Sequence, residues 1–290
     1  MPTRMSGNID SAIKRLTQAG IGEDDARFDI SLIFSYTGDD AELFEKAVTR
    51  RAEGEPVAYI IGRQAFYKEE YKVTPDVLIP RADTELLVET ALGFAGALGF
   101  AAGDLSEVPE YSGSKKSLRI LDLCTGTGCV GISVINTLLE KHITASAVLS
   151  DVSGAALDIA GENIGTSCKD PGTVTVVRLD VMNEDPADGL FDIITANPPY
   201  INASDMTTLD REVKDHEPAL ALQGGEDGLM FYPHICNIAL KCLNKGGMLA
   251  VEHGYDQGDD VREILINKGF NNVKTLKDFG GNDRVTFGIL

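Results

Sequence analysis

The sequence lacks any apolar run near the roughly 20 residues that a membrane-spanning helix requires. Its first ten residues contain one Arg and no apolar segment of the kind found in secretory signals. Of the 290 residues, 43% are hydrophobic and 24% are charged, which is typical of a globular protein. We therefore expect a cytoplasmic protein without a membrane partner, and its length favours one large domain and one smaller domain.

The sequence also has no closely spaced pair of cysteines, and it has fewer basic than acidic residues. The five cysteines include no Cys-x-x-Cys pair, which argues against a zinc knuckle or a disulfide framework, so we expect no metal site. There are 26 Lys and Arg residues against 45 Asp and Glu residues, a net charge of -19. Such a charge repels a phosphate backbone unless a local basic patch opposes it, and we expect no stable binding to nucleic acid.

The chain divides into three segments of different composition. In residues 1–55 apolar residues recur at helical spacing, with Gly22 and Gly38 as breaks, which predicts a small helical domain. Residues 56–82 are rich in β-branched and aromatic side chains, which predicts a β-hairpin between two domains. Residues 83–290 are the main domain, with a first helix predicted at about residues 83–98 and a loop at residues 99–117.

After residue 117, strand and helix patterns alternate. We predict strands at residues 118–123 and 145–149 and helices at residues 130–139 and 155–164. Further strands are predicted at residues 174–177, 191–196, 247–252, 273–276 and 285–289. This alternation is typical of an α/β fold in which helices wrap a mostly parallel sheet.

A glycine-rich segment, Asp122-Leu-Cys-Thr-Gly-Thr-Gly128, closes the first of these strands and opens a helix. Backbone without side chains allows a ligand to approach closely there. Gly126, Gly128 and Gly131 also satisfy the dinucleotide pattern G-x-G-x-x-G, which alone is a weak signal. The carboxylate of Asp122 suits a cationic amino-acid moiety better than a pyrophosphate, and an acid at the end of the next strand can accept from both ribose hydroxyls. These acids favour S-adenosylmethionine as the cofactor.

Asp180 and Val181 follow the third strand of this domain, where the adenine would lie at the carboxyl edge of the sheet. A solvated carboxylate in a loop is an equally good interpretation of Asp180. The candidate cofactor-binding residues are therefore Asp122, Cys124, Thr125, Gly126, Thr127, Gly128, Asp151, Asp180, Val181 and Asn197.

Asn197-Pro-Pro-Tyr200 follows the apolar strand at residues 191–196 and should emerge at the carboxyl end of the sheet beside the cofactor. Two prolines remove backbone donors and make this loop rigid. The side-chain oxygen of Asn197 and the carbonyl of Pro198 can accept both N–H bonds of an –NH2 group. Tyr200 can offer an aromatic face to a flat substrate group. We predict that Asn197, Pro198, Pro199 and Tyr200 are the catalytic and substrate-binding residues of a methyltransferase that acts on a conjugated nitrogen.

Together with these two motifs, four further segments make the chain resemble the release-factor glutamine methyltransferases, the HemK/PrmC family. They are residues 56–62 (PVAYIIG), 77–85 (VLIPRADTE), 217–229 (EPALALQGGEDGL) and 278–285 (DFGGNDRV). The resemblance covers nearly the whole chain. It departs from the family at Cys124, which stands where glycine is usual, and at Ala82-Asp83, which replaces Pro-Glu.

The resemblance implies a Rossmann-like class I S-adenosylmethionine-dependent methyltransferase domain with a helical substrate-recognition domain before it. It implies transfer of a methyl group to the glutamine of the Gly-Gly-Gln loop in class I peptide-chain release factors, giving N5-methylglutamine and S-adenosylhomocysteine. The family's cofactor-binding residues correspond to Thr125 through Gly128 and to Asp151, and its glutamine-binding loop corresponds to Asn197 through Tyr200. Arg81 lies in a segment that resembles the lining of the cofactor and substrate pocket.

Three other functions compete with this interpretation. An adenine-N6 methyltransferase of DNA or RNA uses the same Asn-Pro-Pro-Tyr chemistry, but the chain shows only short basic pairs such as Arg50-Arg51. A glutamine methyltransferase of a ribosomal protein shares the catalytic motif, and residues 56–62 and 78–85 favour the release-factor enzyme instead. A scaffold without activity is disfavoured by the intact Asp122, Asp151 and Asn197. We expect the enzyme to be a monomer.

Overall fold

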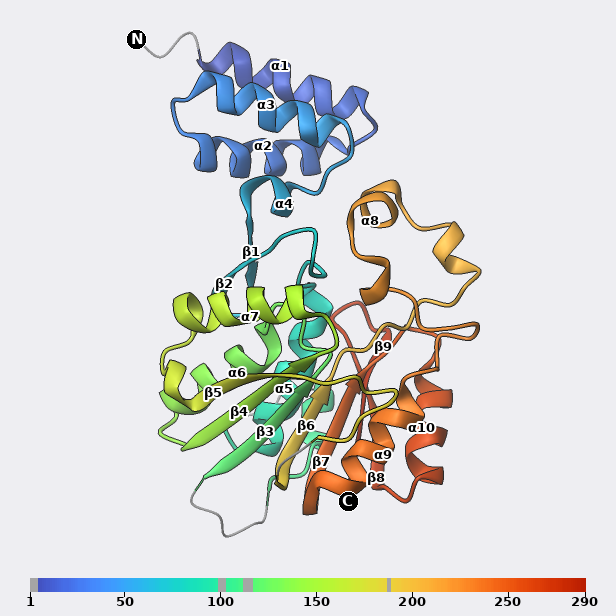
Figure 1. The fold of residues 1–290 in the computed structure, drawn as a ribbon. Helices are drawn as coiled ribbons and strands as arrows, with labels where there is room; N and C mark the ends of the chain where they lie inside the picture. Colours follow the sequence, from blue (N-terminus) through green and yellow to red (C-terminus); the bar gives the residue numbers. More distant parts are fainter. Residues whose placement is uncertain (1–4, 99–102, 112–116, 187–188) are drawn as a thin grey trace.

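The N-terminal part of the chain is a small bundle of three helices, α1 (Met5–Gln18), α2 (Glu23–Thr37) and α3 (Ala41–Ala52). The computed structural model describes residues 5–98, 103–111, 117–186 and 189–290 (Figure 1). Apolar residues at helical spacing bury one face of each helix against the others, with Leu16, Ile33 and Val48 at the centre. Asp40 caps α3 by accepting from two backbone N–H groups.

Between the bundle and the sheet lie a short helix, α4 (Val57–Ile61), and a hairpin of β1 (Arg63–Phe66) and β2 (Glu69–Lys72). The hairpin was predicted, but the β-rich composition of residues 59–61 was misleading because these residues are helical. Pro56 stands at the N-cap of α4, and Gly62, with a left-handed φ of 74°, ends it. Tyr71 on β2 is fully buried against the main domain.

The main domain is built on a seven-stranded sheet in the order β5-β4-β3-β6-β7-β9-β8 (Figure 1). The strands from β5 to β7 are parallel, and β9 is antiparallel to both of its neighbours. Their bounds are β3 Leu118–Leu123, β4 Ala145–Asp151, β5 Val174–Arg178, β6 Phe191–Ala196, β7 Leu243–Glu252, β8 Asn271–Lys277 and β9 Asp283–Ile289. The predicted α/β fold is confirmed, and each predicted strand lies within an observed one.

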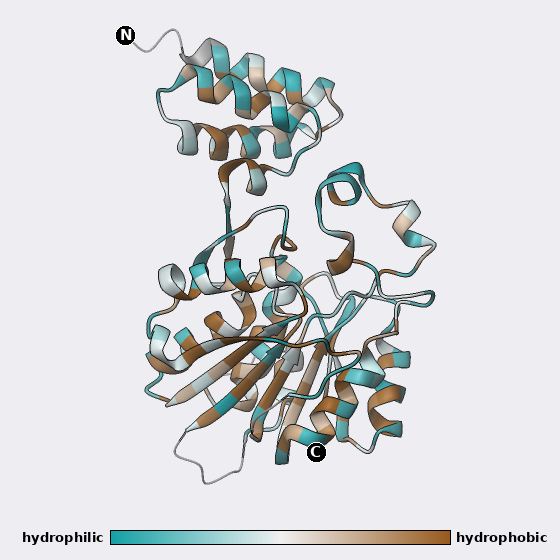
Figure 2. Ribbon diagram, viewed as in Figure 1, coloured by the Kyte–Doolittle hydropathy of each residue, from teal (hydrophilic) through white to brown (hydrophobic). Residues whose placement is uncertain are grey.

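Helices cover both faces of this sheet. Side chains alternate across each strand, so Ile120, Ile193 and Met248 pack under α5 and α6, whereas Ile194 and Leu249 pack under α9 and α10. Figure 2 shows the central strands as largely hydrophobic, as expected for parallel strands that are buried on both faces. The helix bounds are α5 Glu85–Phe94, α6 Cys129–Glu140, α7 Gly154–Ser167, α8 Arg211–His216, α9 Tyr232–Cys242 and α10 Gly258–Asn267.

Short 3₁₀ helices account for the remaining differences from the sequence prediction. The helix predicted at residues 83–98 is shorter: a 3₁₀ turn, η1 (Ala82–Thr84), precedes α5. Within the predicted loop, η2 (Gly103–Glu107) is a 3₁₀ turn, and residues 99–102 and 112–116 lie outside the described part of the chain. Others are η3 (Pro171–Thr173), η4 (Asp205–Thr207) and η5 (Ala219–Ala221).

Arg51 connects the N-terminal bundle to the main domain through a half-exposed ion pair. Arg51 on α3 donates to Asp29 on α2 at 2.6 Å and to Glu212 on α8 at 2.9 Å. Arg51 and Asp29 are both buried, whereas Glu212 is partly exposed. The Arg51–Glu212 pair thus joins α8 to the bundle. Over the described residues, none of the helices combines the length and the apolar character needed to cross a membrane.

Candidate active site

The carboxyl ends of three neighbouring parallel strands, β4, β3 and β6, bring the two sequence motifs together. Leu123, the last residue of β3, pairs with Ala196, the last residue of β6, so the glycine-rich segment and Asn197 leave the sheet at the same level. Ligands of open α/β sheets bind at this edge. The two predicted motifs therefore face a common space although about 70 residues separate them in the sequence.

The glycine-rich loop turns sharply between β3 and α6. Cys124, Gly126 and Gly128 have φ values of 55°, 54° and 82°, the left-handed region that glycine adopts without strain. A Cβ atom on Gly126 would have no neighbour within 4 Å, so this backbone is open to an approaching ligand. A Cβ atom on Gly131 would lie 2.2 Å from Leu149, so the first turn of α6 needs glycine at this position, where it packs against β4.

Asp122 is buried beneath this loop, with 1% of its surface exposed. Its carboxylate accepts hydrogen bonds from the hydroxyls of Thr125 and Thr195. Burial raises the pKa of Asp122 to about 6, and the two hydroxyls oppose that rise. At neutral pH the Asp122 carboxylate is therefore mostly ionised, and its negative charge lies directly under the glycine-rich loop.

Asp151, at the end of β4, holds the loop in place. Its carboxylate accepts from the backbone N–H of Gly126 at 2.9 Å and from that of Ser153 at 3.0 Å. Burial raises its pKa, while these backbone donors oppose the rise. Each carboxylate oxygen can accept further bonds, so the loop contacts leave capacity for a ligand.

The Asn197–Tyr200 segment is fixed by its neighbours. The Asn197 side-chain NH2 donates to the hydroxyl of Thr84 at 3.2 Å, and its Oδ1 atom accepts no hydrogen bond from the described residues. At the other end, the side chain of Gln257 donates to the carbonyl oxygen of Tyr200 at 3.0 Å. The segment therefore presents the oxygen of Asn197, and not its NH2 group, for a further contact.

Gly224 packs directly on the backbone of the same segment. A Cβ atom there would lie 2.7 Å from Cα of Tyr200 and 2.8 Å from the carbonyl oxygen of Pro199, so Gly224→Ala must displace the loop. Because misplacement by about 1 Å can cost a hundredfold in rate, we expect methyl transfer to fall by about tenfold to a hundredfold. Cofactor affinity should change little. Single-turnover kinetics would measure the loss.

Gly161→Ala on α7 is a matched control for that substitution. A Cβ atom on Gly161 meets nothing within 4 Å, so the same chemical change should leave transfer unaffected. A Gly224→Ala enzyme as active as Gly161→Ala would show that the contact with Tyr200 and Pro199 does not set the loop position.

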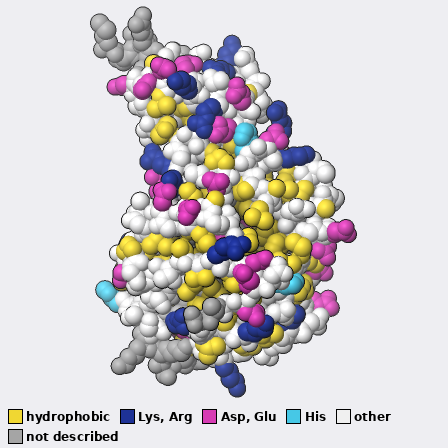
Figure 3. All heavy atoms as spheres, viewed as in Figure 1, with side chains coloured by type: hydrophobic (Ala, Val, Ile, Leu, Met, Phe, Trp, Pro, Cys, Tyr) yellow, Lys and Arg dark blue, Asp and Glu magenta, His cyan; other side chains and the backbone are white. Residues whose placement is uncertain are grey.

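A cavity of about 300 Å³ lies between the glycine-rich loop, η1, η5 and the Asn197–Tyr200 segment. Figure 3 shows hydrophobic side chains gathered between the N-terminal helices and the sheet domain on the face drawn. The predicted site residues that line the cavity are Arg81, Asp122, Cys124, Thr125, Gly126, Thr127, Asp151, Asp180, Val181, Asn197 and Pro199.

Three predicted residues do not line this cavity: Gly128, Pro198 and Tyr200. Gly128 lies beneath the loop, where a Cβ atom would be 3.1 Å from Leu149.

Tyr200 was expected to offer an aromatic face to the substrate. Instead its hydroxyl donates to Glu252, the last residue of β7, at 3.4 Å, and this contact holds the end of the Asn197–Tyr200 segment against the sheet. Asp180 lines the cavity, but its carboxylate accepts from groups of its own turn.

Several residues that contribute to the site were missed by the sequence analysis. Glu217 is buried, forms a close ion pair with Arg81 and accepts from the backbone N–H of Ile79. Burial raises the pKa of Glu217, and the guanidinium of Arg81 opposes that rise. Thr84 and Glu252 contact the Asn197–Tyr200 segment. Glu252 ends a strand at the carboxyl edge, the same signal that identified Asp151.

Comparison with known proteins identifies the family. The sequence is 36% identical to a release factor glutamine methyltransferase of Agrobacterium fabrum, over 97% of this chain and 96% of that protein. It is 34% identical to the release factor glutamine methyltransferase of Haemophilus influenzae, over 87% of this chain and 84% of that protein. The chain belongs to the release factor glutamine methyltransferase family. The resemblance inferred from its motifs is thereby confirmed.

Domain families and a solved structure agree with this membership. Residues 35–62 match the PrmC N-terminal domain, and residues 108–226 match the methyltransferase small domain. The catalytic domain of hMettl16, solved in complex with the MAT2A 3'UTR hairpin 1, superposes with a TM-score of 0.54 at 12% identity, covering 88% of this chain and 81% of that one. That similarity supports the methyltransferase fold of this family member. The match to the PrmC N-terminal domain spans α3 and α4. This family match therefore includes the helix α4, which the sequence analysis had assigned to a hairpin.

Proposed function

We propose that this enzyme methylates the side-chain amide of the glutamine in the Gly-Gly-Gln motif of class I peptide-chain release factors, with S-adenosylmethionine as the methyl donor. The observation that carries the proposal is the orientation of Asn197, whose NH2 group is engaged by Thr84 and whose Oδ1 atom is left to accept. Family membership supports the acceptor.

The cavity fits this cofactor chemically. The open backbone at Gly126 gives room for close approach, and the ionised Asp122 beneath the loop favours a cationic amino acid. Asp151 lines the cavity at the end of β4, where it can accept from ribose hydroxyls. Val181 and Met182 supply apolar contacts for an adenine. S-adenosylmethionine supplies an electrophilic methyl group on its sulfonium.

The chain orients the acceptor nitrogen. An amide nitrogen is a poor nucleophile because its lone pair is delocalised into the carbonyl group. The Oδ1 atom of Asn197 and the carbonyl of Pro198 can accept both N–H bonds of the substrate amide and hold its nitrogen in one orientation toward the methyl group. Rigid acceptors that are already in place cost no reorganisation when charge develops on the nitrogen.

A protein substrate needs a surface larger than the cavity. We assign residues 1–55 to recognition of the release factor, residues 56–82 to a linker that contains the hairpin, and residues 83–290 to catalysis. Arg81, which lines the cavity and is partly exposed, would contact the substrate. A substrate that takes part in translation is consistent with an enzyme that acts in the cytoplasm, and we propose that it acts there as a monomer.

Transfer of a labelled methyl group tests the function directly. Purified release factor, ribosomal protein and nucleic acid would each be incubated with the enzyme and labelled S-adenosylmethionine, and the methyl group located by mass spectrometry. We expect the label on the glutamine of the Gly-Gly-Gln motif. Label on adenine or on a ribosomal protein, with none on the release factor, would overturn the proposal.

Cofactor binding has its own test at Asp151. We expect Asp151→Ala to weaken the affinity for S-adenosylmethionine by about tenfold to a hundredfold, because a hydrogen bond to a charged group contributes about 1.5–3 kcal/mol. Titration calorimetry would measure it. Asp158→Ala, which removes an exposed carboxylate from the neighbouring helix α7, is the matched control and should bind normally. Equal affinities for the two variants would refute the assignment of Asp151 to the cofactor.

A further inference from the structure

The side chain of Gln257 contacts the backbone of the Asn197–Tyr200 segment although it takes no direct part in the proposed chemistry. It donates to the carbonyl oxygen of Tyr200 at 3.0 Å and accepts from the backbone N–H of Gly254 at 2.9 Å. A carbonyl can only accept and a backbone N–H can only donate, so one of the two orientations of the Gln257 amide satisfies both partners. Gln257 is 7% exposed, and both contacts are therefore shielded from water.

Gln257 stands at the N-cap of α10 but does not act as a cap. Ser, Thr, Asp and Asn are preferred at this position because their side chains accept from the first N–H groups of a helix. Within the described part of the chain, the Gln257 side chain makes no such bond. It is directed instead at Tyr200, 57 positions away in the sequence. What this residue contributes is thus the contact with Tyr200 and Gly254.

Gly228 leaves the space in which the contact between Gln257 and Tyr200 forms. A Cβ atom on Gly228 would lie 2.3 Å from the side-chain nitrogen of Gln257 and 2.4 Å from the carbonyl oxygen of Tyr200. Any side chain at this position would therefore separate the donor from the acceptor. Gly228 also has a φ of 78°, the left-handed region that favours glycine.

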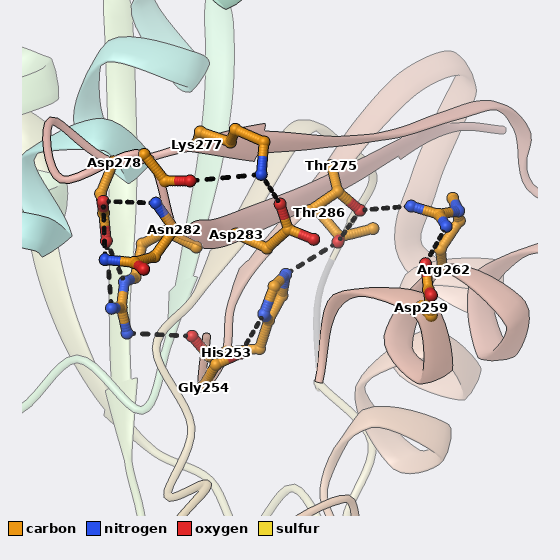
Figure 4. Close-up of polar contacts among 12 residues, drawn as sticks. His253, Gly254, Asp259, Arg262, Thr275, Lys277, Asp278, Asn282, Asp283 and Thr286 are labelled. Carbon is orange, nitrogen blue, oxygen red and sulfur yellow. Dashed lines mark hydrogen bonds and ion pairs between the residues drawn. The ribbon is translucent and has the colours of Figure 1, made fainter. Parts of the chain in front are cut away.

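The loop before α10 is held to β8 and β9 by a series of hydrogen bonds (Figure 4). The buried ring of His253 contacts the carbonyl oxygen of Gly254 at 2.8 Å through Nδ1 and the hydroxyl of Thr286 at 2.9 Å through Nε2. Thr286 contacts the hydroxyl of Thr275 at 2.8 Å, and Thr275 accepts from the guanidinium of Arg262 at 3.3 Å. The carbonyl oxygen of Gly254 is thereby tied to side chains on both strands.

The direction of each bond in this series follows from its neighbours. The carbonyl of Gly254 can only accept, so the proton of the His253 ring is on Nδ1, and burial lowers the pKa of His253, which favours the neutral ring. Nε2 then accepts from Thr286. Thr286 has no second proton, so it accepts from Thr275, whose own oxygen accepts from Arg262. Every member has a partner, as a rigid buried network requires.

The backbone of the same loop is attached to β9 at Arg284. The N–H of His253 donates to the carbonyl oxygen of Arg284 at 3.0 Å, and the guanidinium of Arg284 donates to the carbonyl oxygen of His253 at 3.2 Å. That guanidinium is held by Asp278 at 3.1 Å and pairs with Asp83 on η1 at 3.3 Å. The loop that carries Gln257 is therefore fixed by its side chains and by its backbone.

We propose that Gln257 is a positioning residue for methyl transfer: its NH2 group holds the carbonyl oxygen of Tyr200, and with it the end of the Asn197–Tyr200 segment, in the place that the reaction needs. The hydrogen bonds from Arg262 to Gly254 keep Gln257 in position. The inference rests on the proposed function, because the position of the segment matters only if it receives a substrate amide. Gln257 is not among the described residues that line the cavity, so it acts through Tyr200.

Gln257→Met tests the proposal, because methionine has a similar length and makes neither hydrogen bond. We expect the single-turnover rate constant for transfer to intact release factor to fall by about tenfold to a hundredfold, the range expected for a misplacement of up to about 1 Å. KM for release factor and the affinity and stoichiometry of cofactor binding should change little. A merely structural role would instead lower the fraction of enzyme that binds cofactor and leave the rate constant of the folded fraction unchanged.

Gly228→Ala breaks the same contact without changing Gln257 and should lower the rate constant by a similar factor. Gly246→Ala is its matched control. Gly246 has a φ of 80°, so alanine meets the same backbone strain there, but its Cβ atom would meet none of the described atoms within 4 Å. The difference between the two variants therefore isolates the separation of Gln257 from Tyr200.

The support behind Gly254 has its own pair of variants. Thr286→Val keeps the shape and removes the hydroxyl that donates to His253, so we expect a smaller loss of transfer, about threefold to tenfold. Thr286→Ser keeps the hydroxyl and should restore the rate constant. The proposal would be overturned by a Gln257→Met enzyme with the wild-type rate constant, or by a Gly228→Ala enzyme as fast as Gly246→Ala. If the wild-type enzyme leaves release factor unmethylated, the proposed function fails instead, so the two failures are distinguishable.

Discussion

Replacing Asn197 by alanine is expected to lower single-turnover methyl transfer to release factor by about two to three orders of magnitude, the range found when one preorganised catalytic hydrogen bond is removed. The loss follows because Oδ1 of Asn197 is the side-chain acceptor that the site leaves open for the substrate amide. Affinity for S-adenosylmethionine should change little, since Asp122, Asp151 and the glycine-rich loop stay intact. Rapid-quench transfer at saturating cofactor, with calorimetric titration of the cofactor, measures both quantities.

Asn197→Asp is the matched variant because it keeps an acceptor and removes the NH2 group. Without that donor, the hydroxyl of Thr84 loses the bond at 3.2 Å and can donate to the new carboxylate instead. We expect partial activity at best. Unimpaired transfer by the alanine variant would mean that Asn197 only terminates β6, and that the acceptor for the amide lies elsewhere in the cavity.

Removal of the three N-terminal helices should have a comparably large effect, confined to the intact protein substrate. A chain that begins at Glu55 is expected to methylate intact release factor at least a hundredfold more slowly, because remote contacts hold the reacting amide in place. A short peptide that contains Gly-Gly-Gln gains little from such contacts, so both enzymes should methylate it at similar rates. For each enzyme, kcat/KM for intact release factor is divided by kcat/KM for the peptide. We expect this ratio to be at least a hundredfold lower for the truncated enzyme than for the full-length enzyme.

The point of truncation matters for that experiment. A cut near Thr74 would also remove β2, whose Tyr71 is fully buried against the main domain, and α4, whose Tyr59 donates to Val77. Beginning at Glu55 removes Arg51 and leaves Glu212, which is partly exposed and tolerates the loss. Circular dichroism and cofactor affinity serve as controls for folding. Equal rates on intact release factor would show that residues 1–54 do not take part in recognition.

The sheet could be predicted from the sequence because its strands carry a strong local signal. Residues 191–196 are mostly apolar and include two isoleucines, and the structure buries all of them in β6. The helix α4 could not be predicted in this way. Its residues Tyr59, Ile60 and Ile61 favour strands, and the helix depends on Pro56 before it and on packing against the bundle and the segment around Val77.

The candidate site was predictable where its residues lie at or directly after the carboxyl ends of strands, as Asp122, Asp151 and Asn197 do. It was not predictable where function depends on a contact between distant side chains. Thr84 meets Asn197 across 113 positions of sequence, and Tyr200 meets Glu252 across 52. The ring of Tyr200 was given a role toward the substrate because composition cannot show which way a side chain points.

The position of β9 in the sheet has a consequence for how the enzyme matures. β9 lies between β7 and β8 although it follows both in the sequence, so until β9 has been synthesised β8 has no partner strand in the sheet and β7 is paired on the β6 side alone. A nascent chain that has completed the glycine-rich loop and the Asn197–Tyr200 segment still exposes one side of β7, a site for mispairing with other chains. Insertion of β9 closes that gap and delivers Arg284 to Asp83 and His253 in the same step. The last strand to be synthesised therefore both completes the sheet and supplies the contacts of Arg284 with Asp83 and His253 beside the active site.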